Sequence, residues 1–123
     1  MSYKIIGKYI KDLDFNIPNP KTFFLLAKDI TNYKINVDIK STQVKQNIIE
    51  VLTSLNLSSD RSDFEKIETK IIFSAIVELN NDKLAKEEIE KIILIDVPTE
   101  IYPELRGIFV FLFENSGFKD VKI

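Results

Sequence analysis

The chain has 123 residues, of which 45% are hydrophobic and 29% are charged, a composition typical of one soluble globular domain with a single core. Its 17 basic and 19 acidic residues leave a net charge of -2, which excludes the basic footprint of a nucleic-acid-binding domain. The sequence contains no cysteine, and this excludes a disulfide framework and thiolate chemistry.

Neither a secretory signal nor a membrane span is expected. The first twelve residues contain no long apolar run of the kind that a signal peptide carries. The longest uninterrupted apolar run, residues 108–113, is far shorter than the ~20 residues that cross a bilayer. The sequence is compatible with the reducing cytoplasm, where we expect the protein to act.

Residues 3–17 alternate between apolar and polar side chains, which is the pattern of a half-buried strand. The alternation assigns apolar side chains to one face, namely Tyr9, Leu13, Phe15 and Ile17. It assigns polar side chains to the other face, namely Lys8, Asp12, Asp14 and Asn16. Pro18 and Pro20 end the strand because proline has no N–H to donate to a neighbouring strand.

Residues 19–32 allow two interpretations. Asn19 and Pro20 can cap and start a short helix that carries Phe23, Phe24 and Ala27. The segment can equally be an irregular crossover with exposed aromatic side chains. We favour the crossover, with some helical turn inside it.

Three further segments show strand alternation, at residues 33–41, 46–58 and 65–79. Their short connections, including a polar turn at residues 58–63, favour antiparallel pairing. The last two strands also carry apolar residues on the nominally polar face, namely Ile48, Leu52, Ile72 and Ile76. That face is therefore partly covered, or it carries an exposed apolar patch.

Two helices are predicted at the C-terminal end. Residues 80–82 form a turn and cap, residues 83–95 place apolar side chains at helical spacing, and Pro98 ends this first helix. Four strands followed by helices predict an α+β fold, in which one domain of residues 1–123 has a four-stranded antiparallel sheet with the C-terminal helices packed on one face.

The second helix lies within residues 97–117. Thr99 can cap it, Pro103 belongs in its first turn, and Gly117 suits the left-handed residue after its last turn. From residue 108 to residue 113 the helix is apolar on all sides, and so short a chain covers only one side with its own sheet. We therefore expect a second subunit on the other side, with an oligomer interface formed by Ile108, Phe109, Phe111 and Leu112.

The chemical inventory gives little reason to expect an enzyme. The sequence has no histidine and no cysteine, and its three glycines are too scattered for a phosphate-binding loop. Asp12 and Asp14 share a strand face and could hold a hard cation or act as acid and base, but such acids are usually solvated. No catalytic residue, no metal site and no cofactor is predicted.

Two segments resemble the SecB family of bacterial protein-export chaperones. The run YIKDLDFNIPNP resembles the family's opening strand, with matches at Tyr9, Lys11, Asp12, Leu13, Phe15, Pro18 and Asn19. The run VPTEIYPELRGIFVFLFENSGF resembles the family's C-terminal helix, with matches at Pro98, Ile101, Pro103, Arg106, Gly117 and Phe118. The strands between them agree as well, so the resemblance covers nearly the whole chain.

The sequence also departs from the family pattern. The Gly-x-Phe segment after the fourth strand is missing, and Lys119 stands where the family has proline. The sequence stops at Ile123, before the family's second helix and acidic tail. Since that tail is one of two family contacts with the export ATPase SecA, its docking is in doubt.

The resemblance implies a homotetramer, a dimer of dimers, that holds unfolded preproteins without ATP and passes them to SecA. It implies that client polypeptides contact aromatic residues, for which we select Phe23, Phe24, Tyr102 and Phe118. It implies an acidic SecA contact on the outer sheet, for which we select Asp12, Asp14 and Glu78.

Other functions remain open from the sequence. A SecB-like chaperone of a toxin–antitoxin pair would carry the same motifs. A small oligomeric α+β protein that binds an apolar ligand between sheet and helices would have the same periodicity. A metal- or carboxylate-dependent enzyme at Asp12 and Asp14 is the third alternative.

Overall fold

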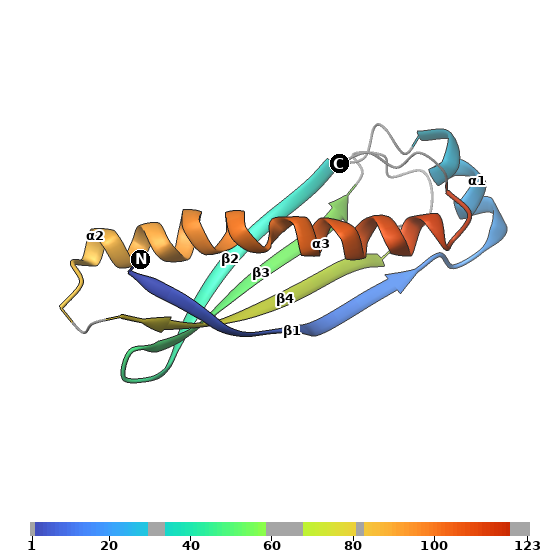
Figure 1. Cartoon of the computed structure of the whole chain (residues 1–123). Helices are drawn as coiled ribbons and strands as arrows, with labels where there is room; N and C mark the ends of the chain where they lie inside the picture. Colours follow the sequence, from blue (N-terminus) through green and yellow to red (C-terminus); the bar gives the residue numbers. More distant parts are fainter. Residues whose placement is uncertain (1, 30–33, 59–67, 81–82, 119–123) are drawn as a thin grey trace.

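One antiparallel sheet, crossed on one face by a long helical rod, makes up the protein in a computed structural model that describes residues 2–29, 34–58, 68–80 and 83–118 (Figure 1). The order of elements is β1 (Tyr3–Asn16), α1 (Pro20–Asp29), β2 (Lys34–Lys45), β3 (Ile48–Ser58), β4 (Glu68–Leu79), α2 (Lys86–Lys91), η2 (Ile92–Asp96) and α3 (Val97–Glu114). The strands lie in the order β1-β4-β3-β2, all antiparallel. The predicted α+β fold is confirmed.

The strands match the alternation in the sequence, with one missed turn. The strands β2 and β3 extend to a two-residue turn, in which Asn47 adopts a φ of 63°. Asparagine tolerates this left-handed conformation better than most residues do. Residues 59–63 of the predicted polar turn and the beginning of the predicted fourth strand lie outside the described residues. Residues 81–82 of the predicted turn and cap also lie outside them.

The faces of β1 differ from the prediction because the strand contains two irregularities. Residues directly opposite one another in neighbouring strands share a face of the sheet. Leu13 lies opposite Ile71, whose side chain is buried under the helix, whereas Tyr9 lies opposite Ser74 on the other face. A register shift between residues 10 and 12 reverses the alternation. The prediction that Tyr9 and Leu13 share a face is therefore wrong.

The same register shift turns Lys8 toward the helix, where its ammonium group pairs with the carboxylate of Glu104. The prediction that Lys8 lies on the same face as Asp12 and Asp14 is wrong for this reason. Asp12 and Asp14 do lie on the outer face, opposite Ile72 and Lys70 of β4. A bulge in an edge strand has thus exchanged one tyrosine for one lysine on the inner face.

Residues 20–29 form a helix, α1, so the crossover that we favoured is wrong and the alternative is confirmed. The side-chain oxygen of Asn19 accepts a hydrogen bond from the backbone N–H of Thr22 at 2.8 Å, as a helix cap does. Pro20 stands at the first helical position, where its missing N–H costs nothing.

The two predicted C-terminal helices are one continuous rod from Lys86 to Glu114, so the predictions that Pro98 ends a helix and that Thr99 caps the next are wrong. The N–H of Val97 bonds to the carbonyl of Ile92, five residues back, which widens the turn before Pro98. A wide π-helical turn makes room for the proline ring, which in a regular helix clashes with the preceding turn. Pro103 likewise lies inside α3 and not in its first turn.

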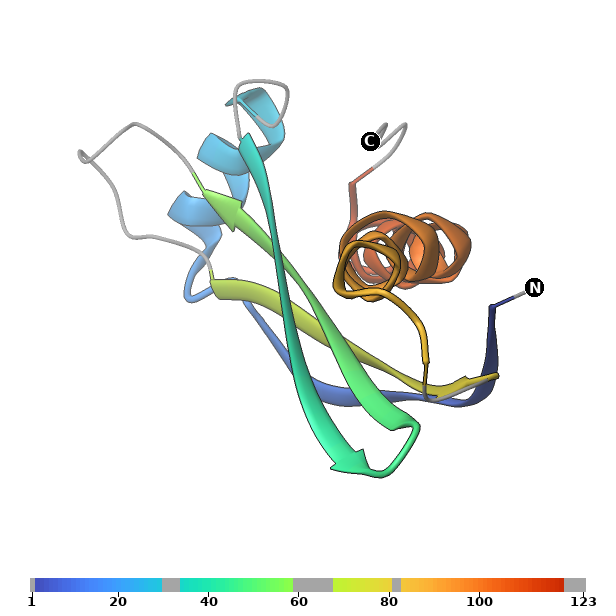
Figure 2. The same cartoon turned by 90° about the vertical axis from the view of Figure 1, so that its left-hand side faces the viewer.

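The core explains why the rod continues through two prolines. Residues spaced four apart on α3 are fully buried against the sheet: Val97, Ile101, Leu105, Phe109 and Phe113. They cover buried side chains of the two central strands: Val51, Leu55, Ile71, Phe73, Ala75 and Val77. Each such burial is worth about 1.5–3 kcal/mol, so the stripe outweighs the cost of the prolines. Figure 2 shows the rod over this face and the opposite face of the sheet without a described helix on it.

Candidate functional site

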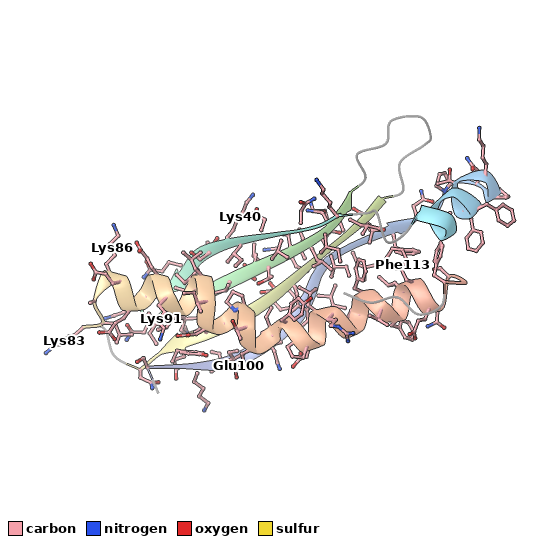
Figure 3. The ribbon with its side chains drawn as sticks, turned by 90° about the horizontal axis from the view of Figure 1, so that it is seen from above. Lys40, Lys83, Lys86, Lys91, Glu100 and Phe113 are labelled. Atoms are coloured by element: carbon pink, nitrogen blue, oxygen red, sulfur yellow. The ribbon has the colours of Figure 1, made fainter. Side chains whose placement is uncertain are left out.

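Aromatic rings connect the surface of α1 to the core under the C-terminal end of α3. Phe24 is 69% exposed and contacts Phe23, with ring centroids 5.6 Å apart. The ring of Phe23 lies 4.9 Å from that of Phe118, which lies 5.6 Å from that of Phe113. Phe113 also contacts Phe15 of β1 at 5.1 Å. Figure 3 labels Phe113 at the end of the rod that lies near α1. We call Phe23, Phe24 and Phe118 the aromatic site.

A helix end positions this site. The N–H of Phe118 bonds to the carbonyl of Phe113 at 3.0 Å, and the N–H of Gly117 bonds to that of Glu114 at 3.4 Å, which is the pattern of a Schellman cap. Gly117 has a φ of 97°, so its predicted left-handed conformation is confirmed. A side chain at Gly117 would meet the ring of Phe23 at 3.2 Å. The glycine therefore both turns the chain and admits the aromatic ring.

The structure separates the four residues selected for client binding. Phe23, Phe24 and Phe118 lie together, but Phe118 is only 4% exposed and supports the site from the core. Its selection as a client contact stays a prediction, although the single chain buries the ring. Tyr102 is exposed on α3, twelve residues before Glu114, which is about 18 Å along the helix. A single groove that presents Tyr102 with the other three is therefore absent from the described part of one chain.

The acidic residues selected for SecA are also divided. Asp12 and Asp14 are exposed neighbours on the outer face of β1. Glu78 lies on the same face but opposite Lys4, six residues along β4 from the partner of Asp12, which is about 20 Å away. The three acids therefore do not form one patch.

The outer face holds a polar network that the sequence analysis missed. The Glu50 carboxylate accepts hydrogen bonds from Tyr9, from Ser74 at 2.8 Å and from Lys11 at 3.2 Å. Its side chain is only 14% exposed. The hydrogen bonds from Tyr9 and Ser74, together with Lys11, hold the pKa of Glu50 below its usual value although burial opposes this. The network joins β1, β3 and β4, and only their register reveals it.

An apolar edge runs between β1 and α3. The two elements run side by side, since Tyr3 donates to Glu100 at 2.9 Å, Lys8 pairs with Glu104, and Phe15 contacts Phe113. Between the last two contacts lie the exposed apolar residues Ile10, Leu13 and Phe111. We call these three residues the apolar edge.

The predicted oligomer interface overlaps this edge only in part. Phe111 is 63% exposed, and Ile108 and Leu112 are half-buried. Phe109 is packed into the core of its own chain against Phe113, at 4.7 Å between ring centroids, so its selection as an interface residue is wrong. Residues 108–113 are apolar all round in the sequence, but Phe109 belongs to the buried stripe of α3 that packs on the sheet.

Among the described residues, no group of three or more acidic residues is arranged to hold a metal ion. Within the same residues, no helix is long and apolar enough to cross a membrane.

The chain is similar to known proteins in sequence and in fold. Residues 1–123 match the family described as preprotein translocase subunit SecB. A SecB protein-export protein of Pelagibacter ubique is 41% identical over 121 residues, 98% of this chain and 86% of that protein. Protein-export protein SecB of Rhodospirillum rubrum is 29% identical over 119 residues, 97% of this chain and 72% of that protein.

A solved structure shares the fold. The SecB-like chaperone of Mycobacterium tuberculosis, in complex with a ChAD peptide from an antitoxin, superposes with a TM-score of 0.63. The alignment covers 99% of this chain and 89% of that one, at 9% sequence identity. At that identity the likeness concerns the fold alone.

Proposed function

The chain belongs to the SecB family, and on this premise we propose that it is an ATP-independent export chaperone that holds unfolded preproteins in the cytoplasm and delivers them to SecA. The observation that carries the proposal is the aromatic site, where an exposed Phe24 rests on Phe23 and a buried Phe118. The relatives named above carry the name of protein-export proteins.

The aromatic site suits an unfolded client for a physical reason. Unfolded chains present apolar side chains in no fixed order, so their receptor needs an adaptable apolar surface more than one shaped pocket. Phenylalanine gives a large contact area with few rotamers to immobilise. In this chain Phe24 offers the area, while Phe23 and Phe118 form the support beneath it.

The test uses Phe24→Ala. We expect it to weaken binding of a permanently unfolded client several-fold. Full burial of a phenylalanine side chain contributes about 1.5–3 kcal/mol, and the variant loses the part of this that the client's cover of the ring supplies. Val44→Ala is the matched control, because Val44 is a similarly exposed apolar side chain beside the turn between β2 and β3. Equal client affinity in both variants would contradict the proposed site.

We also propose that the chain assembles as a homotetramer, a dimer of dimers, through the apolar edge. Ile10, Leu13 and Phe111 are too large to leave in water without cost. Gly107 lies on the exposed surface of α3, and a side chain there would meet nothing within 4 Å in its own chain. A glycine in the middle of a helix is unfavourable, but it lets a second copy of the chain approach the helix closely. Phe111→Asp should dissociate the assembly in sedimentation, whereas Val44→Asp should not.

Delivery to SecA is the third part of the proposal, and it rests on Asp12 and Asp14. The double variant Asp12→Lys with Asp14→Lys should slow SecA association and alter its salt dependence, since exposed charges act mainly on rate. Asp38→Lys is the matched control, because Asp38 is an exposed acid on the same face but on β2. An unchanged salt dependence in the double variant would contradict this part alone.

The neighbouring structure with an antitoxin peptide raises a second candidate, a chaperone of a toxin–antitoxin pair. The relatives with higher identity favour export. A pull-down of unfolded preproteins together with SecA would support export, and selective capture of one small antitoxin would support the alternative.

A further inference from the structure

A lysine of the edge strand β1 reaches the outer face of the sheet because of the register shift in that strand. Lys11 stands inside the shift, between Ile10 and Asp12, and the pairing with β4 passes over it. Its ammonium group lies 3.2 Å from the Glu50 carboxylate of β3 on the outer face. A regular strand would place Lys11 and Asp12 on opposite faces. The shift therefore brings a cation to the face that carries the acids proposed to contact SecA.

Asp12 and Asp14 have different surroundings on this face. Asp14 lies opposite Lys70 of β4, which offers it a cation across the strands. Asp12 lies opposite Ile72, which carries no charge, and Lys11 directly precedes it in the chain. The charge that Asp12 presents to a partner therefore depends on where the Lys11 ammonium group lies.

The Glu50 carboxylate is held in place to receive this ammonium group. Tyr9 and the buried Ser74 both donate to one of its oxygens, Oε2, and Lys11 donates to the other, Oε1. The hydrogen bonds from Tyr9 and Ser74 hold the pKa of Glu50 below its usual value, so the carboxylate is ionised at neutral pH. Two hydroxyl groups thus fix one oxygen, and the other oxygen binds the cation.

We propose that Glu50 is a positioning residue, which holds the Lys11 ammonium group away from Asp12 and so keeps the charge of Asp12 available to a cationic surface of SecA. Without the Glu50 charge, the ammonium group turns to the carboxylate of Asp12, which follows Lys11 directly in the chain. A partner then meets one acid fewer and a second acid that is neutralised. The inference rests on the proposed delivery to SecA and deepens it.

Asp38 is the matched control for Glu50. It is an exposed acid in the same row of the outer face as Asp12, three strands away, which is about 14 Å between the backbones. Glu50 lies two strands from Asp12, and its partner in β4 is four residues from that of Asp12, which is about 16 Å in all. The two acids therefore act on Asp12 at similar range, but Glu50 is the one that pairs with Lys11.

The test measures the association rate of the whole chain with SecA by stopped-flow fluorescence at low and high salt. Glu50→Gln keeps an oxygen that accepts from Tyr9 and Ser74, and it should lower the rate at low salt roughly three- to fivefold. Asp38→Asn removes the same charge and should lower the rate less than about twofold. Both differences should fade at high salt, where the charges are screened. Equal effects of the two variants would overturn the proposal.

Removal of Lys11 from the Glu50→Gln variant gives a second readout. The double variant Glu50→Gln with Lys11→Met has the net charge of the wild type and no ammonium group at residue 11. Its association rate should therefore return to within about twofold of the wild type. A purely structural role of Glu50 predicts no recovery, because Lys11→Met restores none of the contacts of Glu50. A double variant as slow as Glu50→Gln alone would contradict the positioning role.

A measurement without SecA tests the position of the Lys11 ammonium group directly. The relaxation of backbone amide protons by a cationic and by an anionic nitroxide of similar size reports the electrostatic potential near each amide. The potential at the amide of Leu13 should become less negative in Glu50→Gln than in Asp38→Asn. It should return toward the wild-type value when Lys11→Met is added. An equal potential in the two single variants would overturn the proposal.

The outcomes for delivery and for the positioning role are distinguishable. If Asp12→Lys with Asp14→Lys slows SecA association while Glu50→Gln and Asp38→Asn act alike, the positioning role fails and the delivery proposal stands. If the nitroxide measurement shows the expected difference but the double lysine variant associates with SecA normally, delivery through these acids fails. Glu50 then still controls the charge of this face, and its partner is another cationic molecule.

Discussion

The two ends of the helical rod are built in opposite ways. At the C-terminal end the chain follows local rules, because Gly117 turns left-handed and the Schellman cap forms where glycine predicts it. At the other end Pro98 and Pro103 both lie inside the helix, and no side chain caps the start of α2 at Ala85. Local signals decide a helix end only where tertiary packing does not oppose them.

The difference also has a functional side. The C-terminal end carries the aromatic site, whose rings are held by a rigid cap and a buried core. The other end carries a groove between Tyr3 and the rod, whose wall includes the widened turn at residues 92–96. The first surface is apolar and well supported, and the second is lined by the carboxylates of Glu88, Asp96 and Glu100 beside two isoleucines.

The largest change in the free energy of unfolding is expected at the C-terminal end of the rod. Phe113→Ala removes a fully buried ring that contacts Phe15, Phe109 and Phe118, so it should lower the free energy of unfolding by about 3–5 kcal/mol. Urea denaturation at fixed protein concentration measures the change. Phe24→Ala is the control, and its exposed ring should cost less than 1 kcal/mol. Similar decreases in the free energy of unfolding in both variants would contradict the conclusion that the buried Phe113 supports this end of the rod.

Pro103→Ala tests the opposite end. Pro103 is exposed inside α3, so alanine restores a helical N–H without loss of packing. We expect the free energy of unfolding to rise by about 1–3 kcal/mol, measured as a shift of the urea midpoint. A decrease would show that the rod is interrupted near residue 98, as the local signals predict.

Gly107 inside α3 and Gly117 after the end of α3 should respond with opposite signs. Gly117→Ala forces a side chain into a φ of 97° and against Phe23, so it should lower the free energy of unfolding by about 1–2 kcal/mol. Gly107→Ala adds a methyl group in open space and should raise it by about 1 kcal/mol. If the second variant also weakens assembly in sedimentation, Gly107 lies at a contact between copies.

The smallest effect concerns the outer face. Because the pKa of Glu50 is lowered in the folded state, its network stabilises the protein above the ordinary glutamate pKa, and this contribution is lost as pH falls through the lowered value. Tyr9→Phe removes one donor and should lower the free energy of unfolding by about 1 kcal/mol at neutral pH. The difference from the wild type should shrink in acid. Tyr102→Phe on α3 is the control and should show no such pH dependence.

The sequence by itself determined the strands and the antiparallel sheet, because the alternation of side chains along a strand follows directly from which of them avoid water. It also determined Gly117 as the helix end, since few other residues adopt that φ without strain. Asn19 is also readable as a helix cap from the sequence, because its side-chain oxygen suits that position.

Only the tertiary structure decided which side chains meet. A register shift in β1 moved Tyr9 to the outer face and into the Glu50 network, which no spacing along the chain indicates. Burial of Val97 and Ile101 carried the rod past Pro98, next to the widened turn at residues 92–96. The length of that rod then separated Tyr102 from Phe24, because distance along a helix is fixed by its rise and not by the kind of residue.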